Sequence, residues 1–182
     1  MTKGLILLTA AVGLVTARAE VVLEESFTYD DGPIVVQAAD TWKNHSGISA
    51  QAEVYEGQLI LTQSGSEDFH AKLAGGPYKK SSGGTMYASF DVEFTELPIG
   101  GGSYFAHFRD DGFGYRARII AQATGAEGGA FRIGVSSKGK QSTALVDNDL
   151  HLDTVYKVVI AMSLVDASTT LWIDPDDDAA GG

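Results

Sequence analysis

Two acidic residues on one predicted strand are the first candidates for chemistry. Asp91 and Glu93 lie two residues apart in the segment 85–95, where apolar and polar residues alternate. Side chains two apart on a strand share a face, and glycoside hydrolases use two carboxyl groups as nucleophile and proton donor, about 5–5.5 Å apart in retaining enzymes. The alternative is an ordinary solvated strand face with the apolar residues buried behind it. The regular alternation favours this alternative.

An acidic run near the C-terminus is the one candidate for a metal site. Asp174, Asp176 and Asp178 occur at alternating positions, and hard oxygen ligands in this pattern suit Ca²⁺. The corresponding calcium loop requires glycine where Ala179 stands. The alternative is an acidic terminus without fixed structure, which the composition favours. We expect no cofactor other than this candidate calcium ion.

Aromatic residues with polar neighbours are the candidates for ligand binding. The apolar C–H faces of a sugar ring stack on tryptophan or tyrosine, while nearby polar side chains bind its hydroxyls. The alternative is that these rings fill the protein core. Trp172 is out of phase with the aliphatic residues on either side of it, so we expect it to face away from them. The candidates are Trp172, Trp42, Tyr104 and Tyr115, with Asn44, His107 and Arg109 as polar neighbours in sequence.

The segments that must position these residues are strands. Several runs alternate between apolar and polar residues, and pairs of them flank short turns such as Asp110-Asp111-Gly112. No window shows sustained helical periodicity, which indicates an all-β fold, either a sandwich or a barrel. The predicted strands cover residues 21–27, 54–55, 58–63, 85–95, 103–109, 114–123, 130–136, 155–165 and 169–174.

The first nineteen residues predict export. They comprise a basic start at Lys3, an uncharged apolar stretch over residues 4–15 and an Ala-x-Ala pattern that ends at Ala19. The apolar stretch is shorter than the roughly 20 residues that a membrane-spanning helix requires. We therefore expect residues 1–19 to be a signal peptide, and the mature chain to be secreted or held on a bacterial cell surface without inserting into the membrane.

Composition excludes several classes of partner. The 182 residues suit one domain. They carry 13 basic against 24 acidic side chains, a net charge of −11. Without Lys3 and Arg18 of the leader, 11 basic residues face the same 24 acids, a net charge of −13. This charge repels nucleic acid and anionic lipid. The absence of cysteine excludes disulfides and thiolate metal sites.

Five segments together resemble a known family. They are Glu25-Ser26-Phe27-Thr28-Tyr29-Asp30-Asp31-Gly32, Trp42-Lys43-Asn44-His45-Ser46-Gly47, Tyr104-Phe105-Ala106-His107-Phe108, Phe131-Arg132-Ile133-Gly134 and Thr170-Leu171-Trp172-Ile173-Asp174-Pro175. In this order they are similar to concanavalin A-like lectin/glucanase modules, in the laminin-G-like form found in secreted bacterial surface proteins. The resemblance implies an antiparallel two-sheet jelly-roll β-sandwich over residues 20–175.

The resemblance leaves three functions open, because this fold serves several. The first is a non-catalytic binding or adhesive module for a polysaccharide or another glycan of the extracellular matrix. The second is a glycoside hydrolase or lyase that uses Asp91 and Glu93, although the run that begins at Asp91 lacks the first glutamate of the family's usual catalytic signature. The third is a structural spacer within a larger surface protein.

The end of the chain departs from the family pattern. Modules of this kind usually continue beyond the strand that corresponds to residues 169–174, whereas here an acidic, glycine-rich tail follows over residues 176–182. We therefore expect a fragment of a longer chain that lacks its last strand or strands, with one sheet edge exposed.

Overall fold

The computed structural model describes residues 20–112, 114–137 and 139–176, so the predicted signal peptide lies outside the described residues. Strands make up 43% of the chain and helices 5%, and the strand pairs are antiparallel. The predicted all-β class is therefore confirmed. The described part of the chain contains no helix that is long and apolar enough to span a membrane.

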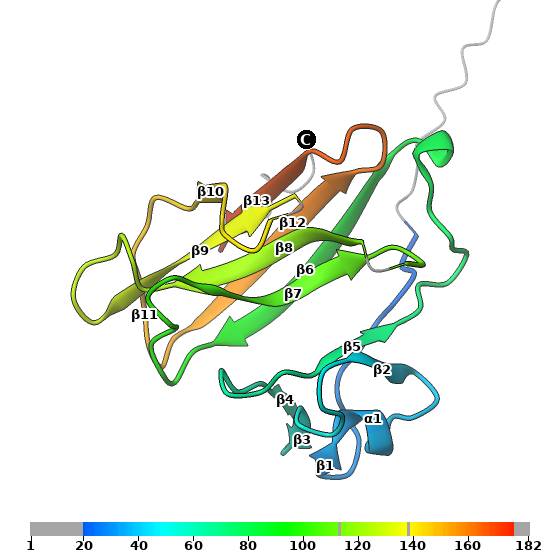
Figure 1. Ribbon diagram of the computed structural model, residues 1–182, viewed down its shortest axis with the longest axis horizontal. Helices are drawn as coiled ribbons and strands as arrows, with labels where there is room; N and C mark the ends of the chain where they lie inside the picture. Colours follow the sequence, from blue (N-terminus) through cyan, green and yellow to red (C-terminus); the bar gives the residue numbers. More distant parts are fainter. Residues whose placement is uncertain (1–19, 113, 138, 177–182) are drawn as a thin grey trace, which may run out of the picture.

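Two antiparallel sheets form the larger part of the molecule (Figure 1). One has the order β13-β12-β6, and the other has the order β10-β9-β8-β7, with β11 also paired to β9. Their strands are β6 (Thr85–Glu93), β7 (Ser103–Arg109), β8 (Tyr115–Gln122), β9 (Ala130–Ser136), β10 (Ala144–Leu145), β11 (Leu150–His151), β12 (Val155–Ser163) and β13 (Thr169–Ile173). The predicted strands from residue 85 onward are confirmed, within two residues at each end.

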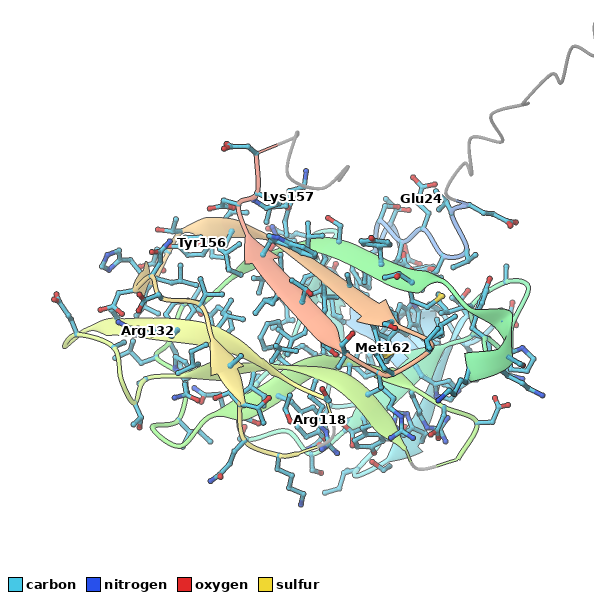
Figure 2. All side chains as sticks on the ribbon, turned by 90° about the horizontal axis from the view of Figure 1, so that it is seen from above. Glu24, Arg118, Arg132, Tyr156, Lys157 and Met162 are labelled. Atoms are coloured by element: carbon cyan, nitrogen blue, oxygen red, sulfur yellow. The ribbon has the colours of Figure 1, made fainter. Side chains whose placement is uncertain are left out.

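The main hydrophobic core lies between these sheets. Phe131 and Ile133 of β9 and Val158 and Ile160 of β12 are at most 1% exposed and belong to one cluster. Alternate residues of β6 join this cluster, as their period of two requires. Figure 2 shows the two layers from above, with Arg118 on the side of β8 that faces away from β12 and β13. Each large apolar side chain buried here contributes about 1.5–3 kcal/mol.

The N-terminal part has a second, smaller core. Its elements are β1 (Gly32–Pro33), the one-turn helix α1 (Ile34–Gln37), β2 (Trp42–Ser46), β3 (Glu53–Tyr55), β4 (Gln58–Ile60) and β5 (Asp68–Ala71). A short 3-10 helix, η1 (Lys80–Ser82), precedes β6. The second core buries Ile34, Ala38, Ala52 and Val54, with Trp42, Phe69 and other rings packed around them. The predicted hairpin at residues 54–63 is confirmed as β3 and β4.

The β-prone run at residues 21–27 joins no sheet among the described residues, so the predicted strand there is wrong. Phe27 has a φ of +52°, which breaks extended geometry. The carboxylate of Glu25 instead accepts hydrogen bonds from the Phe27 backbone N–H at 2.7 Å, the Trp42 Nε1–H at 2.8 Å and the Tyr29 hydroxyl at 2.9 Å. The Glu25 side chain therefore satisfies the Phe27 backbone N–H, which strand pairing would otherwise satisfy.

Strands β2 and β5 form a two-stranded ribbon, here called the β2–β5 ribbon. Trp42 and Phe69 point into the second core, at 5.4 Å between ring centroids. Alternation places Lys43, Asp68 and His70 on the other face. This polar face packs against the sheet of β7 and β8, and it positions the candidate site.

Candidate functional site

The carboxylate of Asp68 lies at the centre of a polar cluster between the β2–β5 ribbon and the sheet. It accepts hydrogen bonds from three hydroxyl groups, each on a different strand. The Ser46 Oγ–H donates to Oδ2 at 2.6 Å, the Tyr104 hydroxyl lies 2.9 Å from Oδ1 and 3.0 Å from Oδ2, and the Tyr115 hydroxyl donates to Oδ2 at 3.1 Å. Asp68 thus connects β5 to β2, β7 and β8.

The guanidinium of Arg118 covers the two tyrosine rings. Its Cζ lies 4.7 Å from the centroid of Tyr115 and 5.1 Å from that of Tyr104, within the range of a cation–π contact. The side chain is buried, and its Nη1 donates to the Gly139 carbonyl at 2.8 Å. The His107 ring lies 4.4 Å from the Tyr115 ring. The tyrosines therefore offer a ligand their hydroxyls and ring edges more than their open faces.

Two β-bulges bring these residues to one face. The pairing of β7 with β8 shifts between Tyr104 and Ala106, and again between Ala106 and Phe108. Ala117, with a φ of +48°, lies within the second irregularity. Each bulge adds a residue to one strand, so Tyr104 and His107 share a face although they are three residues apart. The same holds for Tyr115 and Arg118 on β8.

Three histidines continue the cluster along the ribbon. The Nδ1 atoms of His45 and His70 are 3.3 Å apart, and the His45 ring lies 6.0 Å from that of His107 and 5.8 Å from that of Tyr115. Burial is the largest of the effects that lower the pKa of His45 and of His70, and the charge of Arg109 lowers both further. The Nε2 of His45 is buried and has no hydrogen-bond partner among the described residues.

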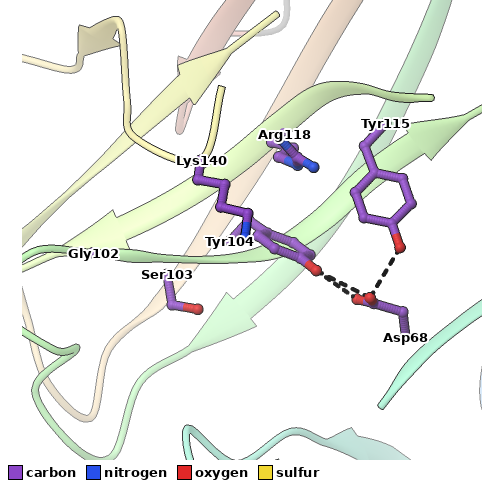
Figure 3. Close-up of a pocket in the computed structure, with 7 residues that line it drawn as sticks. All are labelled: Asp68, Gly102, Ser103, Tyr104, Tyr115, Arg118 and Lys140. Carbon is purple, nitrogen blue, oxygen red and sulfur yellow. Dashed lines mark hydrogen bonds between the residues drawn. The ribbon is translucent and has the colours of Figure 1, made fainter. Parts of the chain in front are cut away.

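A pocket of about 380 Å³ opens beside Asp68 (Figure 3). Among the described residues that line it, none has an aliphatic side chain. The hydroxyls of Tyr104 and Tyr115 converge on Asp68, and Lys140 approaches from the loop after β9. The lining consists of Asp68, Gly102, Ser103, Tyr104, Tyr115, Arg118 and Lys140.

A second pocket, of about 390 Å³, lies at the opposite end of the ribbon. Asp68 pairs with Ser46 at one end of the β2–β5 pairing, and Trp42 pairs with Ala71 at the other. The second pocket contains residues from the Trp42 end and those next to it, namely Asp40, Thr41, Lys43, His70 and Lys72. The polar face of the ribbon therefore has a pocket at each end.

The pKa shifts in the first pocket keep its groups in their usual protonation states at neutral pH. Burial raises the pKa of the Asp68 carboxyl, but the hydrogen bonds from Ser46, Tyr104 and Tyr115 outweigh burial and lower it overall. Burial and the adjacent Asp68 raise the pKa of the Tyr104 hydroxyl. Asp68 is thus an anion and Tyr104 a neutral hydroxyl, as their hydrogen bonds require.

Of the four predicted aromatic candidates, the structure brings together two, Tyr104 and Tyr115, in the first pocket. Arg109 pairs with Tyr115 between β7 and β8, and its charge lowers the pKa of His45 and of His70. Trp42 instead packs against the second core, and its indole N–H donates a hydrogen bond to the Glu25 carboxylate. This position fits the alternative that the aromatic rings fill the protein core.

Trp172 and the two predicted carboxylates lie on the other sheet. Leu171 and Ile173 pack against the main core, so Trp172 points outward, as predicted. Asp91 and Glu93 are exposed on β6 and line neither of the two pockets. Their surroundings are those of a solvated strand face.

The predicted calcium ligands are not assembled in the described part of the chain. Asp174 accepts a hydrogen bond from the Lys157 backbone N–H at 2.6 Å and shapes the end of β13. Asp176 is exposed, and Asp178 lies outside the described residues. Within residues 20–112, 114–137 and 139–176, no group of three or more His, Asp or Glu side chains is arranged to hold a metal ion.

Sequence reasoning missed Asp68, Ser46, Arg118 and Lys140 as site residues. The alternation of polar and apolar residues over Asp68–Ala71 could have indicated a short strand. No local pattern could have shown that the Asp68 carboxylate meets two tyrosines more than thirty residues away.

Comparison of the chain with protein-family models, with curated protein sequences and with solved structures finds no match. The case for a function therefore depends on the geometry of the site.

Replacing Asp68 tests the role of its carboxylate in holding the ribbon. Asp68→Asn removes the negative charge and introduces an amide donor among three hydroxyl donors. Hydrogen bonds to a charged group contribute about 1.5–3 kcal/mol each, so we expect the free energy of unfolding to fall by about 2 kcal/mol in urea titrations. Asp91→Asn on the exposed face of β6 is the matched control and should change it by less than about 0.5 kcal/mol. Equal effects of both substitutions would contradict this role.

The stability of the chain should fall in mild acid because of His107. Burial lowers the pKa of His107 to about 4, the neighbouring Asp68 raises it, and His45, Arg118 and Arg109 lower it. In the unfolded chain its pKa is about 6.5. Between these values the unfolded chain binds the proton and the native chain does not, so stability decreases as pH falls. At about 1.4 kcal/mol per pKa unit, His107 accounts for about 2 kcal/mol between pH 6.5 and 4.5.

Urea titrations across this pH range check the assignment. His107→Gln should reduce the loss of stability between pH 6.5 and 4.5 by about 2 kcal/mol. His151→Gln changes an exposed histidine of β11 and should leave the loss as in the unmodified chain. If the two variants show the same pH dependence, His107 does not carry the effect.

Proposed function

We propose that the chain is a non-catalytic glycan-binding module and that the first pocket is its binding site. The observation that carries the proposal is the convergence of Asp68, two tyrosine hydroxyls, Ser103, Arg118 and Lys140 on one pocket without an aliphatic lining residue. A saccharide presents many hydroxyls, each of which needs a donor or an acceptor when it leaves water. This pocket supplies both at short range.

The pKa shifts support binding over proton-transfer catalysis. A general acid or base works best when its pKa lies near the working pH. The pKa of Asp68 lies below its usual range and that of Tyr104 above its own, so both shifts move these groups away from neutrality. The pKa of His107 is about 4, and at neutral pH its imidazole is uncharged. These groups are suited to form fixed hydrogen bonds.

We further propose that the two facing sheets belong to a jelly-roll β-sandwich of the concanavalin A-like, laminin-G-like class. The two antiparallel sheets with one core between them support this assignment. The leader-like sequence of residues 1–19 supports a secreted or cell-surface location, where polysaccharides and matrix glycans are available. A module of a longer surface protein fits the same location.

Two matched serine substitutions test the proposed site. Ser103 is exposed and lines the first pocket, whereas Ser89 is exposed on the outer face of the other sheet, in the row that contains Val159 and Trp172. Ser103→Trp adds a large ring at the rim of the pocket and should weaken binding of the best ligand from a glycan array by about tenfold or more, a loss of at least 1.4 kcal/mol. Ser89→Trp should leave the affinity within about twofold of the unmodified chain.

Urea unfolding and the affinity of the Ser89 variant separate loss of the site from loss of the fold. Equal urea midpoints of the two variants and the unmodified chain would show that folding is intact. Loss of binding in Ser89→Trp alone would move the site to the face of Trp172. A folded chain that binds no glycan on the array would overturn the proposed function in favour of a spacer.

A further inference from the structure

The two pockets at the ends of the β2–β5 ribbon concentrate positive charge in an acidic chain. Arg118 and Lys140 line the first pocket, and Lys43 and Lys72 line the second. These are four of the 13 lysines and arginines in the sequence, whereas Asp68 and Asp40 are only two of its 24 acids. An even distribution would place about twice as many acids as bases there, so the summed charge of the two pocket linings is opposite in sign to that of the whole chain.

Arg109, which pairs with Tyr115 of the first pocket, adds a further positive charge near this face. Its charge lowers the pKa of His45, of His70 and of His107, which places it within electrostatic range of all three rings. Its Nε is buried and has no hydrogen-bond partner, and Arg109 forms no ion pair, in the part of the chain that the structure describes. A partly buried cation without a counter-ion is costly, and an approaching anion reduces that cost.

The distance between Asp68 and the lysines of the second pocket sets the size of a ligand that reaches both. Asp68 lines the first pocket and Lys72 the second, and they lie four residues apart along the extended β5 segment. At 3.3 Å per residue this is about 13 Å. A single sugar residue is too short for that distance. His70 of the second pocket lies only two residues from Asp68, but a ligand that contacts both Asp68 and Lys72 must be an oligomer or a polymer.

We infer that the ligand is an anionic polysaccharide whose carboxylate or sulfate groups bind at both ends of the ribbon, near Lys140 and Arg118 at one end and near Lys43 and Lys72 at the other. This inference rests on the proposed glycan-binding function and specifies the class of glycan. The net charge, which is −13 without Lys3 and Arg18 (11 basic against 24 acidic residues), disfavours polyanions over most of the surface. It does not prevent binding at the two pockets, because the Debye length at physiological ionic strength is about 8 Å. At contact distance the lysines and arginines of the pockets therefore act more strongly than distant acids.

Calorimetric titration with three hexasaccharides tests the inference. The probes are oligogalacturonate, sulfated oligogalactose and neutral oligogalactose, so that carboxylate, sulfate and uncharged sugars are compared at one length. We expect at least one anionic probe to bind more tightly than the neutral one and to lose affinity as salt is raised. The difference between the carboxylate and sulfate probes identifies which anion is preferred.

Single lysine substitutions locate the charge effect. Lys140→Gln and Lys72→Gln alter exposed side chains, one in each pocket, and each should weaken binding of the preferred anionic hexasaccharide about two- to fivefold. Lys80→Gln is the matched control, because Lys80 is exposed and lines neither pocket. It changes the net charge by the same amount and should leave the affinity unchanged.

Three results would contradict the inference of an anionic polysaccharide ligand. Equal affinity for neutral and anionic hexasaccharides would overturn the inference and leave the proposed glycan-binding function standing. If Lys80→Gln weakens binding as much as the pocket variants do, the attraction is diffuse and the two-pocket inference is wrong. If the folded chain binds none of the glycans, the proposed function fails together with the inference.

Discussion

The carboxylate of Asp68 is the interaction on which the arrangement of this protein depends. Moving a carboxylate out of water is costly unless hydrogen bonds replace its hydration. Here Ser46, Tyr104 and Tyr115 donate three hydroxyl protons, and the pKa of Asp68 lies below its usual value despite burial. The hydrogen bonds therefore outweigh desolvation, and this one side chain holds four strands together.

The hydrogen bonds to Asp68 connect two parts of the molecule whose hydrophobic cores are separate. The buried residues of the main core and those of the N-terminal core form distinct clusters among the described residues. The adjacent Glu67 organises the N-terminal side, where its carboxylate accepts hydrogen bonds from the backbone N–H groups of residues 50–52. Gly47 permits this loop, because a Cβ at that position would lie 1.7 Å from the Ser66 carbonyl oxygen. Neighbouring acids thus shape the ribbon and fix it to the sheet.

Sequence periodicity predicted the regular part of this fold and missed the site for physical reasons. The alternation in β6 predicted its one buried face, because long strands with one buried face have few alternative patterns. In β12 the alternation predicted the face toward the main core, but Val159 and Ala161 on the other face are buried as well. A strict period of two would place Tyr104 and His107 on opposite faces, and the bulges of β7 and β8 reverse that expectation. Trp42 was a candidate for sugar binding by its type alone, yet the ribbon directs it into the second core. Long-range contacts such as those of Asp68 leave no local trace in the sequence.

The most direct test of the account is an NMR titration of the isotope-labelled chain from residue 20 onward with oligogalacturonate. The central claim is that glycan binds between the β2–β5 ribbon and the sheet, at the pocket beside Asp68. The account predicts that the largest changes in backbone amide shift occur at Gly102, Ser103, Tyr104 and Lys140, which line that pocket. Changes confined to the outer face of the other sheet, around Trp172 and Ser89, would contradict it.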